Sequence, residues 1–306
     1  MYRFYQKDVF EIMEYSFNSL SEFLDYLDNT PINTKVWNKR NLSSARKDDG
    51  WSQTKTFQEA RELCKFGYHE NFDKFLSLKD QLSKYIKISY NSKREYNYYV
   101  GYAPNVKAYL EGNPLSMFNK DNSPKKHVDI YYNISVIASV SAKQIYHRGI
   151  ITLCLVEILE SMGYSVGLNL VVLGYSGNQI HYTKLDLKKA GERLNPQKLY
   201  FPMCHPSFLR RLIFRLMEQT PDVNRSWLDG YGSPCSDDVI RWLIPLKEND
   251  IVICGPNEMG VFGQDLAKDA DNVLQYISQF KSDLINVENF RKETGKTRSL
   301  FKQHLD

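Results

Sequence analysis

The sequence predicts an α/β fold in which a mostly parallel sheet is flanked by helices. Three successive stretches support this prediction. Residues 128–140 place apolar side chains at every second position, as a strand with one buried face does. Residues 141–162 repeat apolar side chains at helical spacing, and residues 164–175 are apolar on both faces, which is typical of a buried strand. A strand, a helix and a second strand in this order favour a parallel crossover.

Helices are expected before this unit. Residues 18–29 begin with a capping box, in which Ser19 and Glu22 are three positions apart, and continue with apolar residues at helical spacing. Residues 56–67 follow the same pattern, and Gly67 supplies the stop signal. The N-terminal part of the chain is therefore predicted to be mainly helical.

The chain is expected to divide into three regions. The first is the mainly helical region 1–126, which includes a third helix over 71–88. The second is the α/β domain 127–282, and the third is a charged C-terminal helix or tail, 283–306. The polar, proline-containing stretch 119–126 sets the first boundary.

Two later elements complete the predicted α/β domain. Residues 249–255 read as another buried strand, and residues 264–281 as a closing helix with an apolar stripe. Residues 179–187, which follow the strand predicted at 164–175, are also predicted to form a strand. In sheets of this kind ligands bind at the carboxyl ends of the parallel strands, so a site is expected at that edge.

The composition indicates a globular protein with a packed core. Of 306 residues, 42% are hydrophobic and 25% are charged, and the net charge of +4 gives weak support to a polyanionic partner. The 21 tyrosines fit either a low-GC genome or a surface that contacts protein. The 5 cysteines lack zinc-type spacing, and neither a signal peptide nor a membrane span is evident. We therefore expect a cytoplasmic protein that does not insert into a membrane.

Motifs for cofactor chemistry are absent from the sequence. The predicted loop after the first strand reads SVSAKQ, residues 139–144, in place of a GxGxxG fingerprint, and no GxxxxGK[ST] occurs. No cofactor, no bound metal and no enzymatic activity are therefore expected. Cys204 could act as a nucleophile with His181 as the base that activates it. An enzyme of unrecognised type is therefore kept as an alternative.

The order of strand, serine-containing loop, long helix and buried strand resembles a von Willebrand factor A-type domain. That family has a Rossmann-like sheet and a metal-ion-dependent adhesion site, whose first motif is D-x-S-x-S. Here Ser139 and Ser141 match the two serines, but Ile137 stands at the aspartate position. The resemblance, over 128–282, implies a degenerate metal site, because a hard cation loses its strongest oxygen ligand. Ordinary loop serines are the alternative explanation.

A second resemblance covers most of the chain. Four segments, 51–67, 101–114, 146–164 and 205–218, are similar to those of an uncharacterised family of phage-encoded proteins. This resemblance implies a phage or prophage origin, and it transfers no catalytic residue.

Residues 87–109 interleave aromatic and basic side chains. The tyrosines predicted to contact a partner are Tyr96, Tyr98, Tyr99 and Tyr102. Such a segment could stack bases and pair with phosphates. Tyrosine and arginine are also the residue types that dominate protein interfaces, and an inter-domain loop is the third explanation.

The helix at 205–218 is the other predicted contact surface. Its leucines, Ile213 and Met217 fall on one half when the helix is drawn at 100° per residue. Three arginines occupy the other half, with one phenylalanine among them: these are Arg210, Arg211, Phe214 and Arg215. A solvated face does not need a phenylalanine, so Phe214 is expected to meet either the N-terminal region or another chain.

Three functional hypotheses follow. The leading one is a non-enzymatic phage accessory protein that acts by binding protein, self-assembles as a homo-oligomer and inhibits a host anti-phage defence complex in the host cytoplasm. The first alternative is a DNA- or RNA-binding protein that uses residues 87–109 and the basic tail. The second is an enzyme of unrecognised type.

Overall fold

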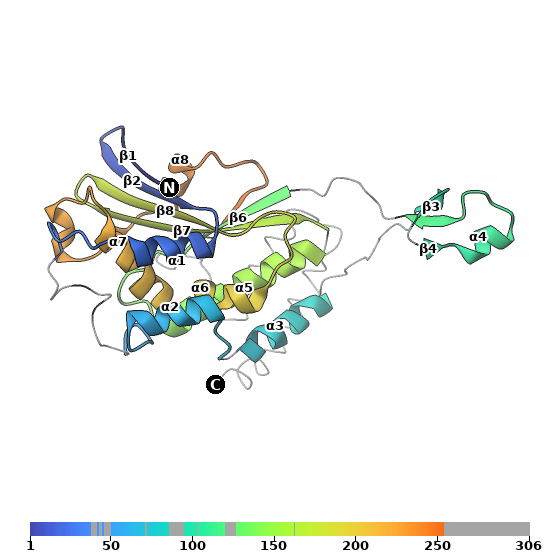
Figure 1. The fold of residues 1–306 in the computed structure, drawn as a ribbon, viewed down its shortest axis with the longest axis horizontal. Helices are drawn as coiled ribbons and strands as arrows, with labels where there is room; N and C mark the ends of the chain where they lie inside the picture. The colour runs from blue at the N-terminus through green and yellow to red at the C-terminus, as the bar shows by residue number, and fades with distance from the viewer. Residues whose placement is uncertain are drawn as a thin grey trace.

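A seven-stranded sheet forms the centre of the protein (Figure 1). The structure, a computed structural model, describes residues 1–37, 42, 45, 50–70, 72–85, 95–101, 103–119, 127–161 and 163–253. Six strands follow the order β1-β2-β8-β7-β6-β10, and β9 pairs with β7. Their bounds are β1 Tyr2–Lys7, β2 Phe10–Phe17, β6 His127–Asn133, β7 Ser165–Ser176, β8 Gln179–Lys188, β9 Ser233–Pro234 and β10 Ile251–Ile253.

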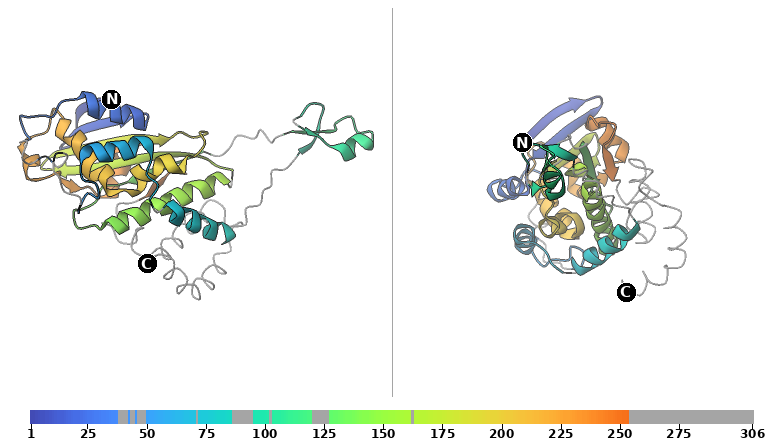
Figure 2. Two further views of the ribbon diagram at one scale, coloured as in Figure 1. Left: turned by 60° about the horizontal axis from the view of Figure 1, so that its bottom comes forward. Right: turned by 90° about the vertical axis from the view of Figure 1, so that its right-hand side faces the viewer.

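Helices cover one face of this sheet in two layers (Figures 1 and 2). The inner layer comprises α1 (Leu20–Asn29), α5 (Ala142–Ser161), α6 (Pro196–Cys204), the π-helix η1 (Phe208–Ile213) and α7 (Phe214–Gln219). The outer helices are α2 (Phe57–Phe66), which packs on η1 and α6, and α3 (Phe72–Tyr85), which packs on α5. The short helix α8 (Asp237–Leu243) lies on the other face, and η2 (Arg225–Asp229) precedes it.

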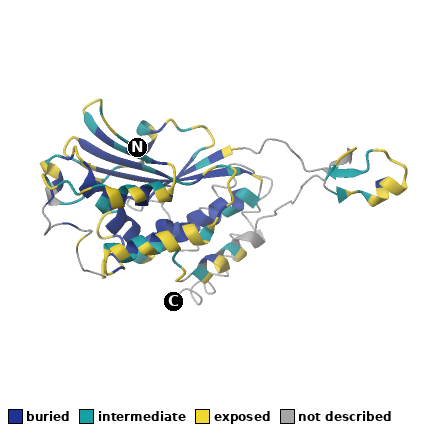
Figure 3. Cartoon of the chain, in the orientation of Figure 1, coloured by how far each residue is buried: buried dark blue, intermediate teal, exposed yellow. Residues whose placement is uncertain are grey.

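Burial follows this layering (Figure 3). The larger apolar core lies between the sheet and the inner helices, and it includes nearly the whole circumference of α5. A smaller core lies between the sheet and α8, where Ile240 and Ile244 meet Val171 and Tyr182. A helix that is apolar all round belongs in the interior, and α5 occupies that position.

The sheet is mixed, and the expectation of a mostly parallel sheet is only partly confirmed. Strand β6 pairs in parallel with β7 and with β10, and β2 pairs in parallel with β8. Strands β7 and β8 are antiparallel, because they form a hairpin that turns at Gly177 with a φ of 60°. The sequence signal that was missed is this two-residue connection between two buried strands. The likeness to a von Willebrand A-type domain stays a prediction.

The N-terminal region is less helical than predicted. Residues 2–17 form the hairpin β1-β2, and β2 joins the main sheet beside β8. The main sheet thus takes strands from both sides of residue 126, and the predicted domain boundary there stays a prediction. The alternation of apolar Met13, Tyr15 and Phe17 with polar Glu14 and Ser16 is the strand signal that the sequence carries here.

Several predicted elements are confirmed. Ser19 accepts a hydrogen bond from the Glu22 amide at 3.2 Å and caps α1, and Gly67 ends α2 with a φ of 98°. The strands expected at 164–175 and 249–255 correspond to β7 and β10, and the helix expected at 141–162 is α5. The strand expected at 128–140 is confirmed only in its first half, because β6 ends at Asn133 and residues 134–140 form neither helix nor strand. The closing helix at 264–281 and the tail at 283–306 lie outside the described residues.

A second, three-stranded sheet stands apart from the main body in both figures (Figures 1 and 2). Its strand order is β3-β5-β4, with bounds β3 Glu95–Tyr98, β4 Ala103–Pro104 and β5 Met117–Asn119, and it carries the short helix α4 (Val106–Leu110). We call residues 95–119 the arm.

Helix α5 approaches α6 unusually closely at Gly149. A Cβ atom built on Gly149 would lie 2.2 Å from the Met203 carbonyl oxygen and 2.6 Å from Cys204 Sγ. These distances are far below van der Waals contact, and one of the two atoms belongs to the backbone. Only glycine allows the two helices to pack at this separation.

Replacement of Gly149 by alanine is therefore expected to push α6 away from α5. Overpacking of a core costs about 1–3 kcal/mol, and the clash with backbone places Gly149→Ala toward the upper end. Urea denaturation followed by circular dichroism measures the loss. Lys143→Ala, an exposed change on the same helix, is the control and should leave the midpoint unchanged. Equal midpoints for the two variants would contradict the close packing.

Candidate functional site

The π-helix η1 carries two consecutive arginines, and both are buried. The Nη2 atom of Arg211 donates to Ser52 Oγ at 2.9 Å and to the Thr54 carbonyl at 2.8 Å. It also reaches the Lys55 carbonyl at 3.3 Å. Ser52 and Thr54 are buried, whereas their neighbours 51, 53 and 55 are exposed, and none of these residues lies in a helix or strand. The guanidinium therefore supplies hydrogen bonds that regular structure does not provide at the two buried positions.

Arg210 binds two other segments at once. Its Nη1 donates to the Trp51 carbonyl at 2.5 Å, and its Nη2 donates to the Val140 carbonyl at 2.7 Å. The guanidinium carbon also lies 4.4 Å from the centre of the Trp51 ring, within the range of a cation–π contact. Burial lowers the pKa of Arg210 to about 10, which leaves it charged at neutral pH. We call Arg210, Arg211 and their bonds to residues 51–55 and Val140 the arginine clamp.

Phe214 lies in a row of stacked rings beside the clamp. Its ring centre is 3.9 Å from that of Tyr231, with the two planes 3° apart. Tyr231 stacks in turn on Trp37 at 5.1 Å, and Phe214 lies 6.0 Å from Trp51. We call Trp37, Tyr231, Phe214 and Trp51 the aromatic column. It joins the N-terminal region, helix α7 and the loop before β9.

These contacts correct the prediction that the helix at 205–218 offers its arginines to a partner. Arg210 and Arg211 are enclosed by this chain's own segment 51–55, and Phe214 meets the N-terminal region through Trp51. Arg215 is half-buried, with its guanidinium carbon 5.6 Å from the centre of the Phe57 ring. A helical wheel cannot show that a non-helical segment covers the polar half.

A cleft adjoins the aromatic column at the carboxyl ends of β6 and β7, the edge where a site was expected. It encloses about 300 Å³ of space, part of which is open to solvent. Its lining residues are Ser135, Val136, Val172, Leu173, Gly174, Leu209, Phe214, Met217, Tyr231, Gly232, Ser233 and Pro234. None of these carries a charge at neutral pH, and the Ser135 hydroxyl already accepts the Leu173 amide at 2.7 Å. The lining therefore suits a small apolar group better than acid–base chemistry.

The loop serines that resemble an adhesion motif have a structural explanation. Ser141 accepts a hydrogen bond from the Gln144 amide at 3.3 Å, and its hydroxyl lies 3.0 Å from Gln144 Oε1. Ser141 thus caps the start of α5, while Ser139 and Ile137 are exposed. Across the described parts of the chain, no group of three or more His, Cys, Asp or Glu side chains could hold a metal ion.

Cys204 and His181 do not form the nucleophile–base pair that was considered. His181 Nε2 lies 3.2 Å from Thr220 Oγ1, and its ring stacks on Tyr15. Burial lowers the pKa of His181 to about 3 and raises that of Cys204 well above its ordinary value. A neutral buried thiol is a poor nucleophile, and Cys204 instead packs against Gly149.

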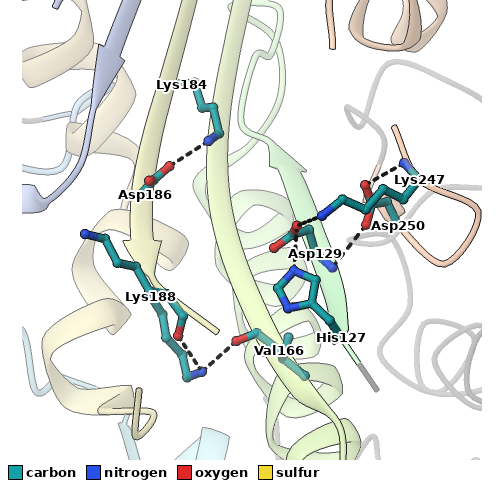
Figure 4. A network of polar contacts seen from close by, with 9 residues as sticks. His127, Asp129, Val166, Lys184, Asp186, Lys188, Lys247 and Asp250 are labelled. Carbon is teal, nitrogen blue, oxygen red and sulfur yellow. Dashed lines mark hydrogen bonds and ion pairs between the residues drawn. The ribbon is translucent and has the colours of Figure 1, made fainter. Parts of the chain in front are cut away.

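A network of charged side chains lies at the amino ends of β6 and β7, at the other end of these strands from the cleft (Figure 4). His127 Nε2 lies 2.8 Å from Asp129 Oδ2, and Lys247 Nζ lies 3.7 Å from the same oxygen. Asp250 accepts the amides of Asp129 and Lys247 at 3.3 and 2.8 Å, which ties the turn before β10 to β6. Burial and nearby carboxylates raise the pKa of Tyr131 to about 12, so its phenol stays protonated.

The same end of the sheet holds a buried lysine. Lys188 Nζ donates to the Val166 carbonyl at 2.6 Å (Figure 4). It also pairs with Glu160 Oε1 at 2.6 Å. Gly167, next to Val166 on β7, makes room for the Asp129 carboxylate, because a Cβ there would lie 2.1 Å from Asp129 Oδ1. Sequence reasoning missed the network. Only the spacing of His127 and Asp129, two apart on one strand face, could have suggested it.

The arm contains the predicted tyrosines. Tyr96 pairs with Phe118 and Tyr98 with Met117 in the backbone register of β3 and β5. Tyr99 is 76% exposed, and Tyr102 lies outside the described residues. The structure thus places Tyr96, Tyr98 and Tyr99 on the arm, far along the sequence from the helix at 205–218.

The arm also exposes an apolar helix face that sequence reasoning missed. In α4, Val106, Tyr109 and Leu110 are 61%, 71% and 78% exposed. Their i, i+3, i+4 spacing puts them on one side of the helix. Asn105 fixes this helix, since its side chain accepts the Ala108 amide at 3.2 Å and its own amide donates to the Ser116 carbonyl at 2.7 Å.

No helix in the described part of the chain is long and apolar enough to cross a membrane. Comparison with known proteins gives one match. The model of a domain of unknown function, DUF7192, matches residues 6–284. A search of curated proteins finds no match, and neither does a search of solved structures. The match covers most of the chain, and it supplies neither an activity nor a partner.

Removal of the Arg211 side chain is expected to destabilise the protein. Arg211→Ala leaves the buried Ser52 hydroxyl and Thr54 carbonyl without their charged donor, at a cost of about 2–4 kcal/mol. Chemical denaturation measures the change. The exposed Arg193 serves as the control, and Arg193→Ala should leave the midpoint in place. A midpoint for Arg211→Ala equal to the control's would show that segment 51–55 does not need the clamp.

Stability is expected to fall with pH below about 6.5. An unfolded histidine binds a proton near its ordinary pKa of about 6.5, whereas burial lowers the pKa of native His181 to about 3 and of His205 to about 4. Between these values the unfolded state binds more protons. Each histidine therefore removes up to about 1.4 kcal/mol per pH unit as the pH falls from 6.5 towards 4. Denaturation curves across that range measure the slope, and His181→Gln should flatten it. An unchanged slope in the variant would refute the assignment to His181.

Proposed function

The chain belongs to the family of this domain of unknown function, and from its structure we propose that it acts by binding another protein through the arm. The observation that carries the proposal is the exposed apolar face of α4, formed by Val106, Tyr109 and Leu110. Next to it along the chain, Tyr99 and Val100 are 76% and 80% exposed. Apolar side chains gathered on a surface in this way mark interaction sites.

The geometry of α4 specifies how a partner would be held. Apolar residues at i, i+3 and i+4 are the anchors with which a helix enters an apolar groove on another protein. Tyrosine contributes a large contact area with few side-chain torsions to freeze, which favours it at interfaces. The partner should therefore present a groove that accepts one turn of helix, with Tyr109 and Leu110 as the central contacts.

Charge on the described part of the arm favours protein over nucleic acid. Lys107 lies 3.9 Å from Glu111, so its charge is partly offset within the arm. A nucleic-acid platform concentrates basic groups around its stacking rings, whereas the described surface is mainly apolar. Binding of DNA or RNA is kept as the alternative, and its signature would be an affinity that collapses as salt rises.

The identity of the partner rests on the sequence resemblance. The four segments similar to phage-encoded proteins support a phage accessory protein without catalytic activity, acting in the host cytoplasm. Within that proposal the arm binds a host protein complex, such as an anti-phage defence complex, and inhibits it by occupying a groove. An enzyme of unrecognised type is the remaining alternative.

Removal of the two central anchors should abolish binding without loss of the fold. The double variant Tyr109→Ser/Leu110→Ser is expected to lose at least tenfold in affinity for a partner captured from host lysate and then purified, as measured by calorimetry. Phe66→Ser is the matched control, because Phe66 is 73% exposed on α2, at a different part of the chain. It should bind as the unchanged protein does.

Two outcomes would contradict the proposal. One is undiminished affinity of the double variant, which would place the interface elsewhere. The other is binding of a labelled oligonucleotide that disappears at high salt and is unaffected by the double variant, which would favour the nucleic-acid alternative.

A further inference from the structure

Strand β1 lies at the edge of the main sheet, and nothing in the described chain pairs with its outer side. It is six residues long, its register with β2 runs without a bulge, and it contains no proline. Proteins usually protect such edges with prolines, bulges, very short strands or charged side chains. β1 has none of the first three, and of its two charged residues, Arg3 and Lys7, Lys7 is bound to Trp242. Phe4 is 48% exposed.

The pairing with β2 shows which backbone groups of β1 face outward. Met1 and Ser16 exchange two backbone hydrogen bonds, so they form a hydrogen-bonded pair of the antiparallel ladder. Such pairs alternate with non-hydrogen-bonded pairs. The odd-numbered residues of β1 therefore bond to β2. The amides and carbonyls of Tyr2, Phe4 and Gln6 point to the open edge.

We propose that this edge pairs with the same edge of a second copy of the chain, antiparallel and centred on Phe4. In that register Phe4 lies opposite Phe4 of the second copy, and Tyr2 lies opposite Gln6. Each of these pairs can exchange two hydrogen bonds, so every outward amide and carbonyl of the three residues finds a partner. A two-fold axis through Phe4 relates the copies, as in most homodimers.

Side chains and charges fit this register. Phe4 meets its own copy directly across the junction, where aromatic pairs stabilise antiparallel strands. Arg3 lies opposite Tyr5, so the arginines of the two copies do not face each other. Lys7 is already engaged within its own chain, since its Nζ donates to the Trp242 carbonyl at 2.6 Å and lies 4.4 Å from the Trp242 ring.

A register shifted by two residues is less favourable. A two-fold axis at Tyr2 would leave Phe4 and Gln6 beyond the end of the partner strand, and an axis at Gln6 would run β1 past the turn at Asp8, whose φ is 54°. The centre at Phe4 is the one that uses all three outward residues. The inference concerns a surface separate from the arm, and it does not depend on the proposed function.

Substitutions at Phe4 test the junction with little effect on the fold. Phe4→Pro removes an outward amide that β2 does not use, so the variant should keep its circular dichroism spectrum while its dimer dissociation constant rises at least tenfold. Phe4→Thr keeps the amide and a strand-forming side chain, and should remain mainly dimeric at micromolar concentration. Light scattering with size-exclusion chromatography measures both.

Crosslinking tests the register independently. Residues that face each other in a hydrogen-bonded pair have Cα atoms about 5.5 Å apart, which a disulfide can span. Phe4→Cys should therefore form a covalent dimer under mild oxidation, whereas Arg3→Cys, one residue away and on the opposite sheet face, should not. A monomeric unchanged protein, a dimer that Phe4→Pro leaves intact, or faster crosslinking of Arg3→Cys would each overturn the proposal.

Discussion

The hydrogen bonds of two buried guanidinium groups hold together the parts of the main body that the chain order separates. Residues 51–55 form neither helix nor strand, and Ser52 and Thr54 within them are buried, so the polar groups of these two residues need hydrogen-bond partners that regular structure does not supply. Arginine offers five N–H donors in a rigid fork, which suits several carbonyls at once. Arg211 binds this segment from η1, and Arg210 joins it to the loop before α5. Helix α2 starts directly after the segment and packs on η1.

Local signals in the sequence were sufficient to predict most of the helices and strands around the arginine clamp. Capping residues fixed the starts of α1 and α2, and apolar periodicity identified β6, α5 and β7. The direction of strands was harder, because the pairing of β2 with β8 depends on contacts between residues far apart in the chain. The arginines were misassigned for the same reason. Amphipathic spacing shows that two faces of a helix differ, but it does not show whether water or another segment covers the polar one.

The candidate contact residues fall into two groups, one buried within the chain and one exposed to water. Arg210 and Arg211 make hydrogen bonds within the chain, and Phe214 stacks on a ring of the same chain. These contacts hold the segments of the main body together. The apolar side chains of α4 remain exposed to water in the described structure, at a free-energy cost that a bound partner would remove. A dimer joined through β1 would carry two arms, and a partner with two grooves would then bind both with an effective concentration set by their separation.

The parallel pairing of β2 with β8 has a consequence for the order in which the protein acquires its structure. Glu11 and Gln179, whose side chains bond at 2.8 Å, are 168 residues apart. On a ribosome, where the chain emerges from its N-terminus, the hairpin β1-β2 leaves the exit tunnel long before its neighbour in the sheet exists. Until then both of its edges are open, and the apolar face that includes Met13 and Phe17 has no core to join. Closure of so long a loop is slow, so β1 and β2 are synthesised long before they are secured in the main sheet, and a nascent chain is exposed to aggregation at this hairpin in the meantime.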